Sequence, residues 1–266
     1  MILAFSAWFG LAAAAGAALL YGVLALASQR MSMSASRGLL LAAWLLHALA
    51  LAEGLLGQPP RFGFAPALST TVWLVVTVYA VESKLIPELK ARWALAAVGA
   101  AAVLLSLAFP GSSYNRIASP WLPLHWALGI ASYGLFGAAL LHGWLMSRTE
   151  RLMRSAHAAE AGVPLLKLER LTFRFVEAGF ILLTASLLAG WFFAETLYGP
   201  HLGSLWNHKT VFSVLAWLTF AGLLVGRARL GWRGRKARNV LYLGSGLLLL
   251  GYAGSRFVLE VVLHRA

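Results

Sequence analysis

The sequence has no cysteine and little negative charge. None of its 266 residues is a cysteine, which excludes disulfides, thiolate metal sites and thiol redox chemistry in this chain. Asp and Glu number 9 against 22 Lys and Arg, and charged residues make up only 12% of the chain, about half of what soluble domains carry. The sequence also lacks a polar stretch long enough to fold by itself, so we expect one transmembrane domain over residues 1–266.

Hydrophobic runs fill most of the chain, in which 60% of the residues are hydrophobic. The runs recur at roughly 17 to 25 residues, the length of a membrane-spanning helix. This pattern predicts an all-α fold, a polytopic integral membrane helix bundle. The predicted spans are residues 2–27, 38–57, 66–82, 93–110, 121–146, 175–197, 209–226 and 240–263.

The basic residues alternate between the two sides of these spans. Seventeen of the 22 Lys and Arg fall in the loops after the first, third, fifth and seventh spans, 4 fall on the opposite side, and Arg256 lies within the last span. The positive-inside rule then places both termini on the outer, periplasmic side of a bacterial inner membrane. The charge is explained by topology, with some attraction to anionic lipid, and we expect no nucleic-acid partner.

Two segments leave a choice of interpretation. Residues 2–27 lack a basic segment before their apolar run, so we interpret them as a retained span and not as a signal peptide. The segment from Pro164 to Phe175 interleaves leucine and phenylalanine with charge. It fits either an interfacial amphipathic helix leading into the sixth span or a solvated basic connector.

The sequence contains no motif of hydrolases, kinases or nucleotide-binding enzymes. GxxxxGK[ST], GxSxG and HExxH are all absent. We therefore predict that the protein is not an enzyme and assign no catalytic residue.

Polar chemistry is concentrated on the predicted outer side. The hairpin 198–209 holds Trp206, His208 and Lys209, while His125 opens the fifth span and His264 closes the last. Two imidazoles facing each other suit haem iron and need no sulfur ligand. Tryptophans would supply flat walls to such a site, although each of them equally fits an ordinary interfacial aromatic belt. The tryptophans concerned are Trp121, Trp126, Trp191 and Trp206.

Arg256, Glu260 and His264 are spaced i, i+4 and i+8, which puts them on one face of an α-helix. In that arrangement Glu260 would neutralise Arg256 and orient the imidazole of His264. The same spacing also fits an alternative, in which Arg256 and Glu260 form a snorkelling ion pair near the membrane interface and His264 is disordered.

The chain resembles the cytochrome c assembly, or haem-handling, membrane proteins, in their small eight-span branch of YpjD- and HemX-like proteins. His125 is followed by the pair Ser132-Tyr133, His264 follows Tyr252-Ala-Gly254, and Trp206 and Trp217 fall in the register of the family's tryptophan-rich loop. The segments GWRGRKA (231–237) and YAGSRF (252–257) also look typical of that branch. The resemblance is clearest over residues 121–264, and Asn207 stands where the family has an aspartate.

This resemblance implies haem b, bound non-covalently, with iron as the only metal. His125 and His264 would be axial ligands, and Glu260 and Arg256 would support His264. The implied pocket or propionate contacts are Trp206, His208, Lys209 and Arg116. The implied role is accessory, in cytochrome c biogenesis or haem homeostasis, with partners among the proteins of cytochrome c maturation or haem biosynthesis.

Two alternative functions come from other classes. A cofactor-free membrane scaffold or regulator would act on a partner protein through the basic inner loops, and a transporter is less well supported because few charges lie within the spans. His47 and His142 lie deep in predicted spans. Each fits either a haem path through the membrane or a neutral histidine that is hydrogen-bonded to a neighbouring helix.

Overall fold

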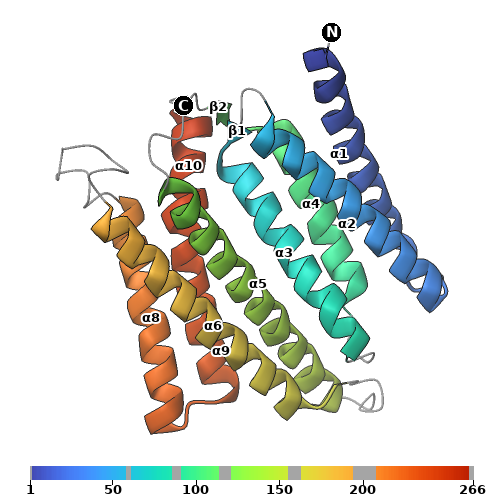
Figure 1. Ribbon diagram of the computed structural model, residues 1–266. Coiled ribbons are helices and arrows are strands. Elements are labelled where there is room, and N and C mark those ends of the chain that lie inside the picture. Colours follow the sequence, from blue (N-terminus) through green and yellow to red (C-terminus); the bar gives the residue numbers. More distant parts are fainter. Residues whose placement is uncertain are drawn as a thin grey trace. The chain divides into compact units, whose positions relative to one another are not determined.

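The computed structural model describes the chain at residues 2–57, 61–85, 91–113, 121–154, 163–193 and 208–263. Almost all of it is helical, with one two-residue antiparallel ladder (Figure 1). The elements in chain order are α1 (Ile2–Ala27), α2 (Met33–Leu56), β1 (Arg61–Phe62), α3 (Phe64–Leu85), α4 (Arg92–Ala108), β2 (Ser112–Ser113), α5 (Trp121–Arg154), α6 (Leu165–Phe192), α8 (His208–Leu230), α9 (Gly234–Leu249), the π-helical turn η3 (Leu250–Gly254), α10 (Ser255–Phe257) and the π-helical turn η4 (Val258–Val262). The predicted all-α fold class is confirmed.

Seven helices in the described part of the chain are long and apolar enough to cross a membrane. The remaining predicted span, residues 93–110, corresponds to α4, which has 17 residues. At 1.5 Å per residue it is about 25 Å long, slightly less than the hydrocarbon core of a bilayer. The prediction of a multi-pass membrane protein is confirmed with seven candidate spans, and the side on which the termini lie stays a prediction.

Helices α5 and α6 extend further toward each other than the hydrophobic runs indicated. α5 has 34 residues and ends at Arg154, and α6 begins at Leu165. The predicted spans 121–146 and 175–197 left residues 147–174 as a loop, and this loop was predicted too long. The added turns carry good helix formers whose apolar and charged residues alternate at helical spacing. The segment after Pro164 therefore forms the first amphipathic turns of α6, where Leu168 and Phe173 are buried and Arg170 and Arg174 are exposed. Its position at the membrane interface stays a prediction.

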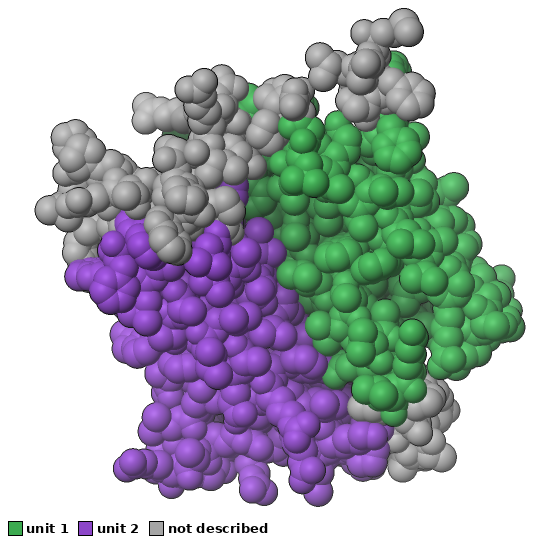
Figure 2. Space-filling view, in the orientation of Figure 1, with its two compact units in different colours: residues 1–116, 256–266 green, residues 117–255 purple. Residues whose placement is uncertain are grey.

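The chain divides into two compact units (Figure 2). Unit 1 comprises residues 1–116 and 256–266, and unit 2 comprises residues 117–255. In unit 1, α1 and α3 each pack against both α2 and α4; in unit 2, α5 and α8 each pack against both α6 and α9. The described residues of each unit thus include four long helices that pack side by side. The expectation of a single domain stays a prediction.

Stacked phenylalanines form the centre of unit 2. The rings of Phe136 on α5 and Phe220 on α8 are 3.9 Å apart and nearly parallel, and both side chains are buried. Glycines on the other two helices admit these rings: a Cβ would lie 2.8 Å from the Phe220 ring at Gly244 and 3.2 Å from the Phe136 ring at Gly179. Small residues at helix contacts are the usual means of close packing between membrane helices.

A tryptophan joins the middle helices of unit 1. The indole of Trp44 on α2 stacks on Trp73 of α3 at 5.0 Å and donates from Nε1 to Thr77 Oγ1 at 2.7 Å. Thr77 in turn donates to the carbonyl of Trp73, one turn earlier, at 2.8 Å. The contact therefore satisfies the indole N–H within the apolar bundle, where an unpaired donor would be costly.

Candidate functional site

His125 lies in the second turn of α5 and is held by the backbone of α6. Its Nδ1 atom is 3.0 Å from the carbonyl oxygen of Ser186, and the Ser186 hydroxyl lies 3.4 Å from the same nitrogen. A carbonyl oxygen only accepts, so Nδ1 carries the proton and Nε2 of the neutral ring keeps its lone pair. Metal-binding histidines commonly have this arrangement, in which the second nitrogen donates to a carbonyl and fixes the ring.

Glycines on both helices allow the imidazole to lie against α6. Gly190 follows Ser186 by one turn, and a Cβ there would lie 3.3 Å from Cε1 of His125. On α5, Gly129 follows His125 by one turn, and its Cβ would lie 3.6 Å from the Ser186 hydroxyl. The half-buried imidazole is therefore positioned by rigid helical backbone and not by a flexible side chain.

Ser132 and Tyr133, which follow His125 on the same helix, serve the packing of unit 2. The Ser132 hydroxyl donates to the Gly129 carbonyl at 2.7 Å, and the Tyr133 hydroxyl donates to the Leu248 carbonyl of α9 at 2.6 Å. Leu248 lies just before the change from α to π geometry at η3, where backbone hydrogen bonding changes its spacing. The Ser-Tyr pair that contributed to the family resemblance thus bonds to backbone carbonyls of α5 and α9.

The predicted residues of the outer hairpin are described only in part. His208 is the first residue of α8 and is exposed, and Lys209 is half-buried beside it. The Lys209 carbonyl lies 3.5 Å from where a Cβ on Gly251 would be, so η3 packs closely on the start of α8. Trp206, Arg116 and the second predicted ligand, His264, lie outside the described residues, so pairing of His125 with His264 stays a prediction.

Arg256 and Glu260 form the predicted ion pair, with Nη1 and Oε1 3.7 Å apart. The other carboxylate oxygen, Oε2, faces the backbone nitrogen of Phe64 at 3.5 Å. Glu260 therefore helps to fix the start of α3. The sequence did not predict this role, because residues 64 and 260 are far apart in the chain. Support of His264 by Glu260 and Arg256 stays a prediction.

The last helix is not a regular α-helix. It passes through η3 and η4, and the Leu263 amide donates to the Val258 carbonyl five residues earlier. Hydrogen bonding thus changes to a five-residue spacing in this segment, although Arg256 and Glu260, four residues apart, still pair.

The two deeper histidines are buried in separate units. Nε2 of His47 is 2.8 Å from the Ser69 hydroxyl of α3, and its ring meets the edge of Tyr21. His142 is fully buried on α5 and stacks on Phe175 of α6 at 5.3 Å. For His47 the geometry matches a histidine hydrogen-bonded to a neighbouring helix. Within the described residues, no group of three or more His, Asp or Glu side chains is arranged to hold a metal ion.

Trp217 contacts α6, although its sequence position matches the family's loop tryptophans. Its ring stacks on Phe180 at 5.4 Å, and its Nε1 donates to Thr184 Oγ1 at 2.8 Å. Thr184 donates to the Phe180 carbonyl one turn earlier, so the arrangement repeats that of Trp44, Trp73 and Thr77 in unit 1. The sequence signal that we overlooked is an aromatic residue followed four positions later by threonine.

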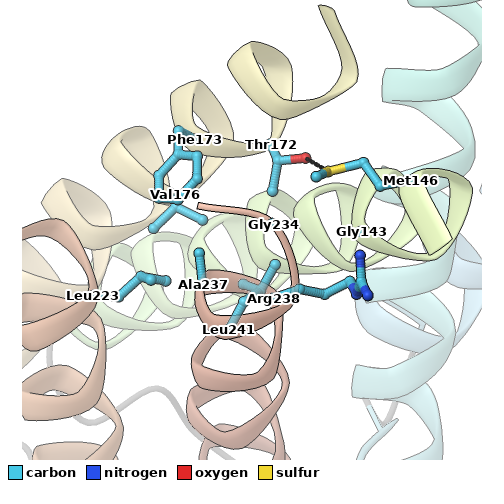
Figure 3. A pocket seen from close by; sticks show the side chains of 10 residues that line it. All are labelled: Gly143, Met146, Thr172, Phe173, Val176, Leu223, Gly234, Ala237, Arg238 and Leu241. Atoms are coloured by element: carbon cyan, nitrogen blue, oxygen red, sulfur yellow. Dashed lines mark hydrogen bonds between the residues drawn. The ribbon is translucent and has the colours of Figure 1, made fainter. Parts of the chain in front are cut away.

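A small apolar pocket lies among the four helices of unit 2 (Figure 3). Thr172 donates to the Met146 sulfur across it at 3.7 Å. The pocket has space for about one water-sized group, so it is far too small to hold a haem. Its lining residues are Gly143, Met146, Thr172, Phe173, Val176, Leu223, Gly234, Ala237, Arg238 and Leu241.

Comparison with known proteins identifies a family and several relatives of this chain. The family model described as "Cytochrome C assembly protein" matches residues 13–263. The inner membrane protein YpjD of Escherichia coli K12 is 29% identical over 178 residues, covering 64% of this chain and 66% of YpjD. The cytochrome c biogenesis protein CcsA of a Prochlorococcus marinus strain is 25% identical over 211 residues, covering 75% of this chain and 63% of CcsA.

A third relative is an uncharacterized 28.8 kDa protein of Azospirillum brasilense, 28% identical over 208 residues and covering 74% of this chain and 76% of that protein. No solved structure matches the chain. Because the family model spans nearly all eight helices, the sequence-based resemblance is confirmed, and the chain belongs to the cytochrome c assembly protein family.

Proposed function

We propose that this protein binds haem b non-covalently at the outer face of a bacterial inner membrane. The role is accessory and non-enzymatic, in cytochrome c biogenesis or haem homeostasis. Membership of the assembly family supports it, as do a relative named for the inner membrane and relatives named for cytochrome c biogenesis.

The observation that carries this proposal is the hydrogen bond between His125 and the Ser186 carbonyl. It leaves Nε2 as the nitrogen available to iron and fixes the plane of the imidazole. The donor chemistry also fits, because a chain without cysteine can offer haem only nitrogen or oxygen ligands, or a methionine thioether. His125 would hold the iron on one side.

The remaining residues of the proposed site come from the sequence. His264 would be the second axial ligand, and Trp206 would wall the haem. His208, Lys209 and Arg116 would contact its propionates or, for His208, offer a further nitrogen. Bound haem would supply a redox-active iron, and the protein would supply orientation and shielding from water.

Absorption spectra of the detergent-purified protein test this proposal. We expect the wild type, oxidised and then reduced with dithionite, to show a Soret band and a sharp reduced α-band. Each band should weaken in His125→Ala and in His264→Ala and vanish in the double variant. His157→Ala is the matched control, because this histidine lies between the fifth and sixth predicted spans, on the predicted inner side and away from the proposed site. Gel filtration should show all variants folded.

A cofactor-free scaffold would give the opposite result. It predicts no Soret band in the wild type even after haem is supplied, and no effect of the outer histidines on function. That outcome would overturn the haem proposal.

A further inference from the structure

The turn between α8 and α9 is strongly basic. Residues 226–238, named here the basic turn, contain six Lys and Arg and no Asp or Glu. Two of the six, Arg227 and Arg238, point back to acidic side chains of neighbouring helices. The other four are Arg229, Arg233, Arg235 and Lys236, and all are exposed.

Arg227 and Arg238 form ion pairs with the acidic side chains near the basic turn. Arg227 pairs with Glu169 of α6 at 2.9 Å and also covers the ring of Phe173 at 3.6 Å. Arg238 pairs with Glu150 of α5 at 2.9 Å. These carboxylates are largely buried and their charge is matched, so neither is left to neutralise the exposed cations.

The backbone of the turn is held in a fixed conformation. Gly231 and Gly234 adopt positive φ angles of 63° and 56°, which favour glycine. The Trp232 amide donates to the Gly226 carbonyl at 3.1 Å, and the indole packs on Gly226. Lys236 lies over the indole with Nζ 4.2 Å from the ring centroid. The four exposed cations are therefore presented by an ordered turn.

Exposed apolar side chains accompany these cations. Leu230, next to Arg229, is 68% exposed, and Leu166 at the start of α6 is 73% exposed. Cations beside exposed leucine suit the boundary where lipid phosphates meet acyl chains. An aqueous acidic surface would leave those leucines in water.

We propose that the basic turn is a binding site for anionic phospholipid, in which Arg233 and Arg235 contact the phosphate and Leu230 contacts the acyl region. The site differs from diffuse attraction between a basic protein and a charged leaflet, because it assigns the interaction to one turn. It does not depend on haem.

Fluorescence transfer to acceptor-labelled lipid tests the proposal. Since the chain has no cysteine, Asn239→Cys offers a single labelling position on the exposed surface beside the turn. The labelled full-length protein is titrated in micelles with acceptor-labelled phosphatidylglycerol or, as the zwitterionic comparison, phosphatidylcholine. Arg233→Gln/Arg235→Gln is compared with Arg170→Gln/Arg174→Gln, which removes two exposed charges from α6 instead.

We expect the wild type to bind phosphatidylglycerol more tightly than phosphatidylcholine. An arginine near an anionic surface contributes about a five-fold increase in binding, so the turn variant, which loses two arginines, should lose about twenty-five-fold in apparent affinity. The control variant should lose little, and the haem spectrum should be unchanged in both.

Equal losses in the two variants would show diffuse charge and overturn the proposed site. No preference for phosphatidylglycerol in the wild type would also overturn it. If the turn variant keeps its lipid affinity but loses a co-purifying acidic protein, the surface serves a protein partner and the proposal is wrong.

Discussion

The carboxylate of Glu260 lies at the amino end of α3, with Oε2 3.5 Å from the backbone nitrogen of Phe64. The first amides of a helix have no acceptor within it, and negative charge near them is favourable. Gly63, just before α3, leaves the space, because a Cβ there would lie 2.7 Å from Oε2. A residue late in the chain therefore acts as the cap that the local sequence does not provide.

Replacing Glu260 should destabilise unit 1. We expect Glu260→Ala to cost about 1 kcal/mol, the usual worth of a helix cap, and Glu260→Gln to cost less because its amide oxygen still accepts. Thermal unfolding in detergent measures both. Glu177→Ala, which removes an exposed carboxylate from α6, is the control, and an equal shift in it would argue against capping.

Adding a methyl group at Gly190 should disturb His125. The new Cβ would lie 3.3 Å from Cε1, which is close enough to displace the imidazole by a few tenths of an ångström. If His125 binds haem as proposed, Gly190→Ala should weaken or shift the reduced α-band. Gly222→Ala on α8, where no atom lies within 4 Å of the added Cβ, should leave the spectrum as it is.

Two glycines of α9 should respond to alanine with opposite signs. At Gly244 the Cβ would lie 2.8 Å from the Phe220 ring, so Gly244→Ala should destabilise unit 2 by about 1–3 kcal/mol through overpacking. At Gly246 nothing lies within 4 Å, so Gly246→Ala should stabilise the helix by about 0.5–1 kcal/mol. The melting temperatures of the two variants, measured side by side, test this prediction. An unchanged melting temperature in Gly244→Ala would contradict the close packing of Gly244 on Phe220.

Trp217→Phe separates packing from ligand binding. The variant keeps an aromatic ring but removes the donor to Thr184, so we expect a loss of about 0.5–1.5 kcal/mol in stability. Trp44→Phe should lose a similar amount, since its indole makes the equivalent bond in unit 1. A large change in the haem spectrum of Trp217→Phe with unchanged stability would instead indicate that Trp217 contributes to haem binding.

Neutralising Arg227 alone should cost more than neutralising it together with Glu169. The single variant Arg227→Gln leaves a largely buried carboxylate without its cation, whereas Arg227→Gln/Glu169→Gln leaves two neutral groups. A double-mutant cycle on thermal stability measures the coupling. Additive losses would show that the pair contributes no interaction.

Hydrophobic runs predicted where the helices lie, because the length of an apolar segment reflects the membrane directly. They did not predict where α5 and α6 end, since the added turns are amphipathic and the apolar signal stops before the helix does. The ion pair of Arg256 and Glu260 followed from local spacing. The cap on Phe64 and the bond from Tyr133 to Leu248 did not, because each joins residues more than 100 positions apart.

The candidate site was predictable to the same extent. Residue type and position in a span identified His125, whereas its partner on α6 is a main-chain atom. Trp217 was matched to the family's tryptophan-rich loop from its sequence register, and its hydrogen-bond partner in the structure, Thr184, lies on α6. Contacts between helices depend on rotation about their axes, which the weakly amphipathic spans of a membrane protein leave undetermined.

Because the Ser186 atom that accepts from His125 belongs to the backbone, any residue small enough for that position supplies the same acceptor. In aligned relatives we therefore expect position 186 to change among small residues while the tautomer of the histidine stays the same. The close packing at positions 129, 186 and 190 requires small residues there. We therefore expect selection to preserve small size at these positions and not one particular polar side chain beside the histidine.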